Sequence, residues 1–270
     1  MKFEAQIKRA GEFLALLDTH EAFRVMKLTS LGALQFLFMD AKVFVPTFRF
    51  DLHSDAALPI VNDYRRELTK ILPGLLLKKH FTIDTKASQF TSSEDQYVIF
   101  DEKNKQFKLE VIFNYIDRKH VMNPEYFAVK NNLFEDIHLY SLSNLENFAI
   151  YIRDVIMQKQ PDTLLNYLVI NKKILPQQYP FIRKMLLFYL SFTPSMTQEM
   201  IKFRVERTYQ AEPQLKDFLL ELTTFNEKEV EFITRYHQGQ IVLSLIYGDM
   251  IAKNLENHPR VISMNKGQRG

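Results

Sequence analysis

The stretch FKLEVIFNY, residues 107–115, has the clearest secondary-structure pattern in the chain. Apolar residues fill every second position and mostly polar ones lie between them, as expected for a strand with one buried face. Similar but shorter runs precede it, separated by helix-like periods. Together they predict a mixed sheet with helices, built from strands at 43–52, 79–84, 97–100 and 107–115 and helices at 4–17 and 60–72.

After residue 140 the apolar residues follow the 3.6-residue period of helices. Helix-start signals support this pattern: Ser195 with Gln198 three residues later, Pro213 in a first turn, and Asn226 before two acidic residues. We therefore expect an α+β protein with a sheet-containing domain at 1–140 and a helical bundle at 141–270. The predicted helices of the second domain are 144–158, 162–171, 180–190, 196–208, 214–224, 227–236 and 240–255.

Composition excludes several kinds of chemistry. The 270 residues correspond to about two domains at a typical size. Cysteine is absent, which excludes disulfides, thiol catalysis and cysteine-based zinc sites. The seven glycines are spaced so that neither a dinucleotide-binding Gly-x-Gly-x-x-Gly loop nor a P-loop can be written. The net charge of +3 is too small to indicate nucleic-acid binding by itself.

Apolar stretches are too short for a membrane span. The longest, 31–39, has nine residues and includes Gln35, whereas a span needs about 18. Glu4 and Glu12 lie where a signal peptide would have its apolar core. We expect a cytoplasmic protein without a membrane partner.

Two polar clusters are candidates for a functional site. Asp51, His53 and Asp55 project from one face if the strand continues, and Glu110 lies on the polar side of another strand. Carboxylates at a strand end suit a divalent cation, although polar residues on the solvent side of two strands are the simpler interpretation. The second cluster, Thr29-Ser30 before a helix, can receive phosphate or provide an N-cap. The seven scattered histidines and the lack of a Gly-x-Ser-x-Gly motif argue against a zinc hydrolase and an α/β-hydrolase.

Read in order, these pieces resemble the AbiEii-type nucleotidyltransferases, the toxins of bacterial abortive-infection toxin–antitoxin pairs. Lys27-Leu28-Thr29-Ser30 stands where the family has Lys-Gly-Gly-Thr/Ser, and Arg49 to Asp55 stands where it has Arg-x-Ser/Thr-x-Asp-x-Asp. The resemblance extends to about residue 260. Its later elements are the acid-bearing strand 107–111, the helix segment 146–151, Pro161-Asp162, the Glu-rich run 226–232, Gly239 and His258-Pro259.

The resemblance implies a Mg²⁺-dependent nucleotidyltransferase with an NTP as substrate. Lys27, Thr29 and Ser30 would receive the phosphates, with Arg49 and Arg153 as further nucleotide contacts. Asp51, Asp55 and Glu110 would hold the metal, and Asp162 would act as a base or an organiser. The implied acceptor is an RNA, notably the tRNA end, or a protein, and a cognate antitoxin is the implied partner.

The family pattern is not fully kept. Leu28-Thr29 replaces its Gly-Gly, and Tyr151 stands in place of its helical lysine. The alternative is therefore a nucleotidyltransferase fold that has lost catalysis and serves as a binding or interaction module.

Overall fold

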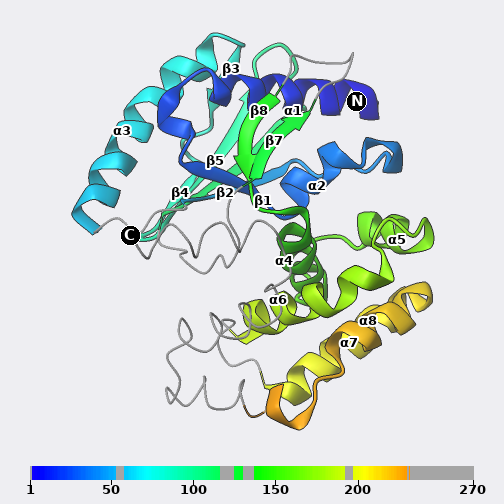
Figure 1. The fold of residues 1–270 in the computed structure, drawn as a ribbon. Helices are drawn as coiled ribbons and strands as arrows, with labels where there is room; N and C mark the ends of the chain where they lie inside the picture. Colours follow the sequence, from blue (N-terminus) through cyan, green and yellow to red (C-terminus); the bar gives the residue numbers. More distant parts are fainter. Residues whose placement is uncertain are drawn as a thin grey trace. The chain divides into compact units, whose positions relative to one another are not determined.

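The computed structural model describes residues 2–52, 58–115, 125–129, 137–191, 197–229 and 231 (Figure 1). The chain divides into two compact units, Met1–Tyr151 and Ile152–Gly270. The division lies inside helix α4 (Asn144–Ile156), close to the end of the predicted first domain at residue 140. We describe each unit by itself.

The first unit contains the sheet. Its described strands form one mixed eight-stranded sheet in the order β3-β5-β6-β2-β1-β8-β7, with β4 also paired to β5. Strand β2 lies antiparallel to β1 and parallel to β6, so the centre of the sheet joins segments from distant parts of the sequence. The strands are β1 (Met26–Thr29), β2 (Thr47–Leu52), β3 (Phe81–Ile83), β4 (Gln89–Phe90), β5 (Glu94–Asp101), β6 (Lys108–Asn114), β7 (Glu125–Val129) and β8 (Ile137–Ser141).

One face of the sheet carries the hydrophobic core. Phe48 and Phe50 of β2 and Phe113 of β6 are almost fully buried on this face. Helices α1 (Phe3–Asp18) and α3 (Leu58–Leu77) cover it (Figure 1). Since burying one such side chain contributes about 2–3 kcal/mol, the row of phenylalanines fixes which way each strand faces.

Helix α2 (Leu31–Leu37) packs close to the sheet through a glycine. A Cβ added at Gly32 would lie 3.1 Å from Leu28 Cδ1 and 3.4 Å from Phe48 Cδ1. A side chain at position 32 would therefore require the Leu28 side chain to shift by a few tenths of an ångström. In the sequence, the short 3₁₀ turn Glu21–Phe23 precedes β1, and a second one, Met39–Ala41, follows α2.

Buried ion pairs attach the two helices to the ends of β5. Arg9 of α1 donates from Nε to Asp101 Oδ2 at 2.9 Å and from Nη2 to Asp101 Oδ1 at 3.0 Å. Arg65 of α3 pairs with Asp95, which is 1% exposed. Buried carboxylates need such partners, because an unpaired charge in the core is costly.

The second unit consists of helices. After the end of α4 come α5 (Thr163–Ile170), α6 (Tyr179–Ser191), α7 (Gln198–Ala211) and α8 (Lys216–Thr223), with 3₁₀ turns at Pro176–Gln178 and Pro213–Leu215. Asn226 and Glu229 form a reciprocal capping pair, in agreement with the predicted helix start there. Thr197, rather than the predicted Ser195, caps α7 by accepting the Met200 N–H.

The predicted α+β class is confirmed. The predicted strand at 43–52 begins at Thr47, and the one at 97–100 extends over Glu94–Asp101. The predicted helix at 240–255 and most of that at 227–236 lie outside the described residues. Within the described part of the chain, no helix combines the length and apolar character needed to cross a bilayer.

Candidate functional site

The face of the sheet opposite the aromatic core carries a row of polar side chains. Strand register places Lys27 of β1 opposite Asp51 of β2, Asp51 opposite Asn114 of β6, and Asn114 opposite Glu94 of β5. Directly opposed residues share a face, so these four side chains form one line across four strands. We call this line the polar row.

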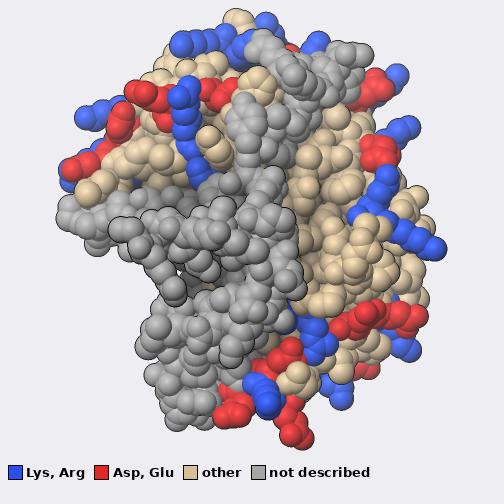
Figure 2. Space-filling model, viewed as in Figure 1, with Lys and Arg blue, Asp and Glu red and all other residues tan. Residues whose placement is uncertain are grey.

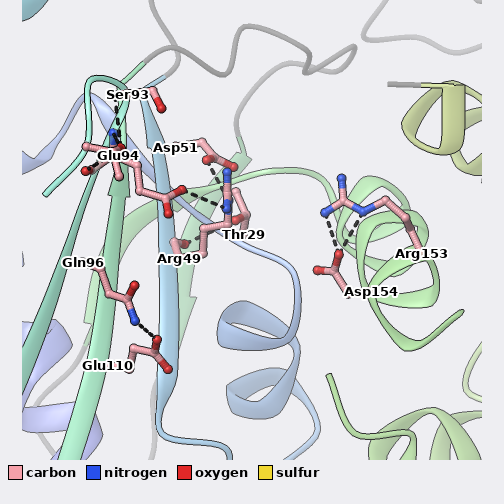
Figure 3. A network of polar contacts seen from close by, with 10 residues as sticks. Thr29, Arg49, Asp51, Ser93, Glu94, Gln96, Glu110, Arg153 and Asp154 are labelled. Atoms are coloured by element: carbon pink, nitrogen blue, oxygen red, sulfur yellow. Dashed lines mark hydrogen bonds and ion pairs between the residues drawn. The ribbon is translucent and has the colours of Figure 1, made fainter. Parts of the chain in front are cut away.

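Arg49 joins two carboxylates at the polar row (Figure 3). Its Nε donates to Asp51 Oδ1 at 3.0 Å, and its Nη1 lies 3.6 Å from Glu94 Oε2. The Asp51 side chain is 3% exposed, against 30% for Arg49 and 34% for Glu94. The partly exposed guanidinium of Arg49 therefore neutralises the buried carboxylate of Asp51.

Glu110 lies elsewhere on the same face. The parallel register of β2 and β6 pairs Glu110 with Thr47, four residues before Asp51. At about 3.3 Å per residue this is a separation of roughly 13 Å along the sheet. Glu110 accepts a hydrogen bond from Thr47 Oγ1 at 3.1 Å. It also accepts one from Gln96 Nε2 (Figure 3). The strands of Asp51 and Glu110 are neighbours, which is the condition for Glu110 to be a third carboxylate, but their register does not bring Glu110 to Asp51.

The turn between β1 and α2 carries Thr29 and Ser30. Thr29 Oγ1 donates to the Arg49 carbonyl at 3.3 Å, which links the turn to the strand of Asp51. Ser30 has φ 57° and ψ −139°, a backbone conformation that favours glycine and costs other residues about 1–3 kcal/mol. Its N–H donates to Asn147 Oδ1 at 2.8 Å. Both side chains belong to buried residues.

Lys27 is a buried cation at one end of the polar row. Its Nζ donates to the Arg24 carbonyl at 2.9 Å and lies 4.5 Å from the centre of the Tyr140 ring. Burial removes water from the ammonium and lowers the Lys27 pKa to about 8. The lysine is thus partly neutral near physiological pH.

Two predicted site residues belong to the second unit. Arg153 donates from Nε and Nη2 to Asp154 Oδ1, at 2.9 and 2.6 Å (Figure 3). Asp162 lies at the start of α5 and lines a pocket of about 520 Å³, together with Lys159 and Arg207. The lining of this pocket is a second polar region, within the helical unit.

The predicted metal ligands are therefore only partly placed. Asp51 lies in the polar row, Glu110 lies apart from it, and His53 and Asp55 lie outside the described residues. Among the residues that the structure does describe, no three His, Asp or Glu side chains come together as a metal site. Asp51 still offers the hard oxygen donors that Mg²⁺ prefers.

Glu94 is a member of this site that sequence analysis missed. The predicted strand began at Tyr97, because Asp95 occupies the apolar phase and interrupts the alternation. Asp95 is in fact buried with Arg65 as its partner, so the strand continues back to Glu94. Extending the alternation of Gln96 and Val98 by one step would have identified Glu94 on the polar face.

The fold resembles that of a solved nucleotidyltransferase toxin. The chain is similar to MenT4, a nucleotidyltransferase toxin from Mycobacterium tuberculosis H37Rv, with a TM-score of 0.61 at 11% identity over 89% of this chain and 92% of that one. A candidate nucleotidyltransferase from H. pylori aligns over 88% of this chain and 94% of its own, with a TM-score of 0.33 at 13% identity. No protein-family model and no curated protein matches the chain. At 11% identity the likeness to MenT4 establishes the fold alone.

Proposed function

We propose that this protein is a Mg²⁺-dependent nucleotidyltransferase that transfers a nucleotidyl group from an NTP to an RNA or protein acceptor. The observation that carries the proposal is the position of Asp51 and Arg49. They lie beside the β1–α2 turn, on a fold shared with a nucleotidyltransferase toxin over 89% of the chain. The transfer chemistry is assigned to the sheet-containing domain, residues 1–140, with the helical domain, residues 141–270, as its accessory part.

The residues of the β1–β2 region fit the recognition of a triphosphate. Arg49 offers a planar guanidinium with 30% exposure, and guanidinium groups bind phosphates in a bidentate manner. Thr29 and Ser30 add hydroxyl groups at the adjacent turn, and Lys27 adds an amino group that is a second cation when protonated. Under this proposal, Arg49 moves from Asp51 to the phosphates when nucleotide binds.

Asp51 and Asp55 would hold the metal, as the sequence pattern implies. Mg²⁺ bound there would activate the acceptor oxygen and stabilise negative charge on the transferred phosphate. Glu110 is the weaker candidate of the predicted three, because its carboxylate is already bonded to Thr47 and Gln96. Asp162 and Arg153 would contribute a base or organiser and a phosphate contact from the helical unit.

The acceptor and the partner are inferred from the toxin-like fold. An RNA such as a tRNA end, or a protein side chain, is the proposed acceptor, and a cognate antitoxin is the proposed partner. On the described surface visible in Figure 2, basic and acidic side chains are interspersed. Such a surface favours a local recognition site for the acceptor over broad electrostatic attraction to a nucleic-acid backbone.

A catalytically inactive binding module is the second candidate. It is favoured by the Arg49–Asp51 ion pair, which already balances the charge of one proposed metal ligand. It is also favoured by Tyr151, which is fully buried where the family pattern has a lysine. A module of this kind would bind nucleotide without regard to metal, or not at all.

Calorimetric titration separates the two candidates. Each of the four NTPs is added to the full chain, first with Mg²⁺ and then with EDTA. The proposed enzyme binds one NTP in a metal-dependent way. It transfers the nucleotidyl group, labelled at its α-phosphate, to total RNA or to protein and releases pyrophosphate. Metal-independent binding without transfer would favour the binding module instead.

Asp51→Asn provides the matched variant for this titration. It keeps the size of the side chain but removes the charge, and we expect it to abolish metal-dependent binding. Asp63→Asn is the control, because Asp63 is 75% exposed and belongs to the surface pair with Arg66. Unchanged binding by Asp51→Asn would show that the metal lies elsewhere.

A further inference from the structure

A buried group of side chains holds the turn between β1 and α2. These side chains come from the last residues of the first unit in the sequence. Asn147 of α4 is 0% exposed, and its Oδ1 accepts the Ser30 N–H at 2.8 Å. Its Nδ2 donates to Ser141 Oγ and to the Leu142 carbonyl, both at 3.0 Å. One amide side chain therefore makes three hydrogen bonds in the interior.

Ser141 completes the contact on the other side of the turn. Its Oγ donates to the Leu28 carbonyl at 2.6 Å. The backbone is thus held at two points, the Leu28 carbonyl before the turn and the Ser30 N–H within it. We call Ser141 and Asn147 the turn clamp.

The turn clamp acts at Ser30, a residue with an unfavourable backbone conformation. Ser30 has φ 57°, although it carries a Cβ, and such conformations persist only where surrounding contacts enforce them. Glycine adopts this region without steric cost. The clamp therefore does for a serine what a glycine would do by itself.

We propose that Asn147 is a positioning residue: it holds Ser30 in a glycine-like conformation and so fixes the turn that receives the nucleotide phosphates. The link to phosphate rests on the proposed function, whereas the link to the backbone conformation does not. Because Asn147 takes the Ser30 N–H, that N–H is not the group that receives the phosphates.

Hydrogen exchange tests the clamp without any ligand. In Asn147→Ala, the amide of Ser30 should exchange about tenfold faster or more, because its acceptor is lost. Asn144→Ala is the matched control, since Asn144 is an exposed residue of the same helix, and it should leave Ser30 unchanged. Unaltered exchange of the Ser30 amide in Asn147→Ala overturns the inference, whatever the result of the nucleotide-binding measurements.

A double-mutant cycle tests the link to nucleotide binding, with the four NTPs and Mg²⁺ as calorimetric probes. Asn147→Ala should weaken binding about tenfold in the wild-type background and much less in the Ser30→Gly background, because glycine needs no clamp. Lys42→Gly is the control for the glycine, since Lys42 also has a positive φ, 53°, but lies outside the clamp. It should give no rescue.

The outcomes separate the inference from the proposed function. If the wild-type chain binds no NTP, the proposed function fails, and the exchange experiment alone judges the clamp. If the wild type binds but Ser30→Gly gives no rescue, or Lys42→Gly gives the same rescue, the positioning role is wrong. Should Asn147→Ala fail to fold, Ser141→Ala serves as the milder variant, with the same expected rescue by Ser30→Gly.

Discussion

Arg49 and Asp51 are two residues apart on β2, point to the same face of the sheet, and form an ion pair with Nε 3.0 Å from Oδ1. Within the proposed site, the guanidinium is thus a cation that any metal ion at Asp51 must compete with. The charge of Asp51 is available to a metal only after Arg49 has moved. Arg49 therefore sets the metal affinity of the free protein.

We expect Arg49→Gln to tighten divalent-metal binding about three- to tenfold when no nucleotide is present, because the competing cation is removed. The same variant should weaken NTP binding, since the phosphate contact is lost. Mn²⁺ titration followed by electron paramagnetic resonance measures the first effect, with Arg66→Gln on the surface as control. Weaker or unchanged Mn²⁺ binding would contradict the proposed competition.

Glu94 and Glu110 should behave differently although both are carboxylates on the polar face. Glu94→Gln removes the second partner of Arg49, which strengthens the hold of Arg49 on Asp51 and weakens metal-dependent NTP binding about threefold or more. Glu110→Gln should leave that binding within about twofold and lower the free energy of unfolding by about 1 kcal/mol. Parallel calorimetry and urea unfolding distinguish the two, and equal effects on binding would contradict the placement of Glu110.

Lys27 should make the stability of the protein rise with pH in the alkaline range. Its pKa is about 8 in the folded protein and 10.5 as the ordinary value, so between these limits the unfolded chain holds a proton that the folded chain has released. Raising the pH through this window therefore stabilises the folded state, by up to about 3 kcal/mol.

Urea unfolding at pH 7 to 10.5 measures this dependence. Lys27→Met should be more stable than the wild type at pH 7, and its advantage should shrink as the pH approaches 10.5. Lys78→Met, at an exposed position, controls for the loss of a surface lysine. A difference between Lys27→Met and the wild type that does not vary with pH would rule out the buried ammonium as its source.

The pair Arg65–Asp95 should be far more important for stability than the pair Arg66–Asp63 on the same helix. Asp95→Asn leaves Arg65 against a buried neutral group and should cost about 2–4 kcal/mol. Asp63→Asn removes a pair whose side chains are 75–76% exposed and should cost less than about 1 kcal/mol. Thermal or urea unfolding compares the two variants directly. Similar losses in the free energy of unfolding would mean that the Arg65–Asp95 pair is exposed to water in solution.

The α+β class was predictable because the strands of the first unit have one apolar face. Residues 107–115 alternate without interruption, and their strand is found with almost the predicted bounds. Strand β1 was harder to predict because it has only four residues. Met26, Lys27, Leu28 and Thr29 do alternate between apolar and polar, but so short a run is at the lower limit at which alternation indicates a strand.

The site was less predictable than the fold because it depends on register. Alternation correctly put Asp51 and Glu110 on polar faces, but only the pairing of β2 with β6 decides that Asn114, and not Glu110, lies opposite Asp51. The role of Asn147 has no local sequence signal at all, since its partner Ser30 is 117 positions away. Contacts of this kind come from the topology of the sheet.

The turn clamp also has a consequence for the order of synthesis. Strand β1 is made early, but its neighbour β8 and the side chain that fixes Ser30 come more than 110 residues later. A nascent chain that ends before Asn147 therefore has the proposed ligand residues Lys27, Arg49 and Asp51 but no fixed turn. Under the proposed function, nucleotide binding therefore begins only after Asn147 has been synthesised.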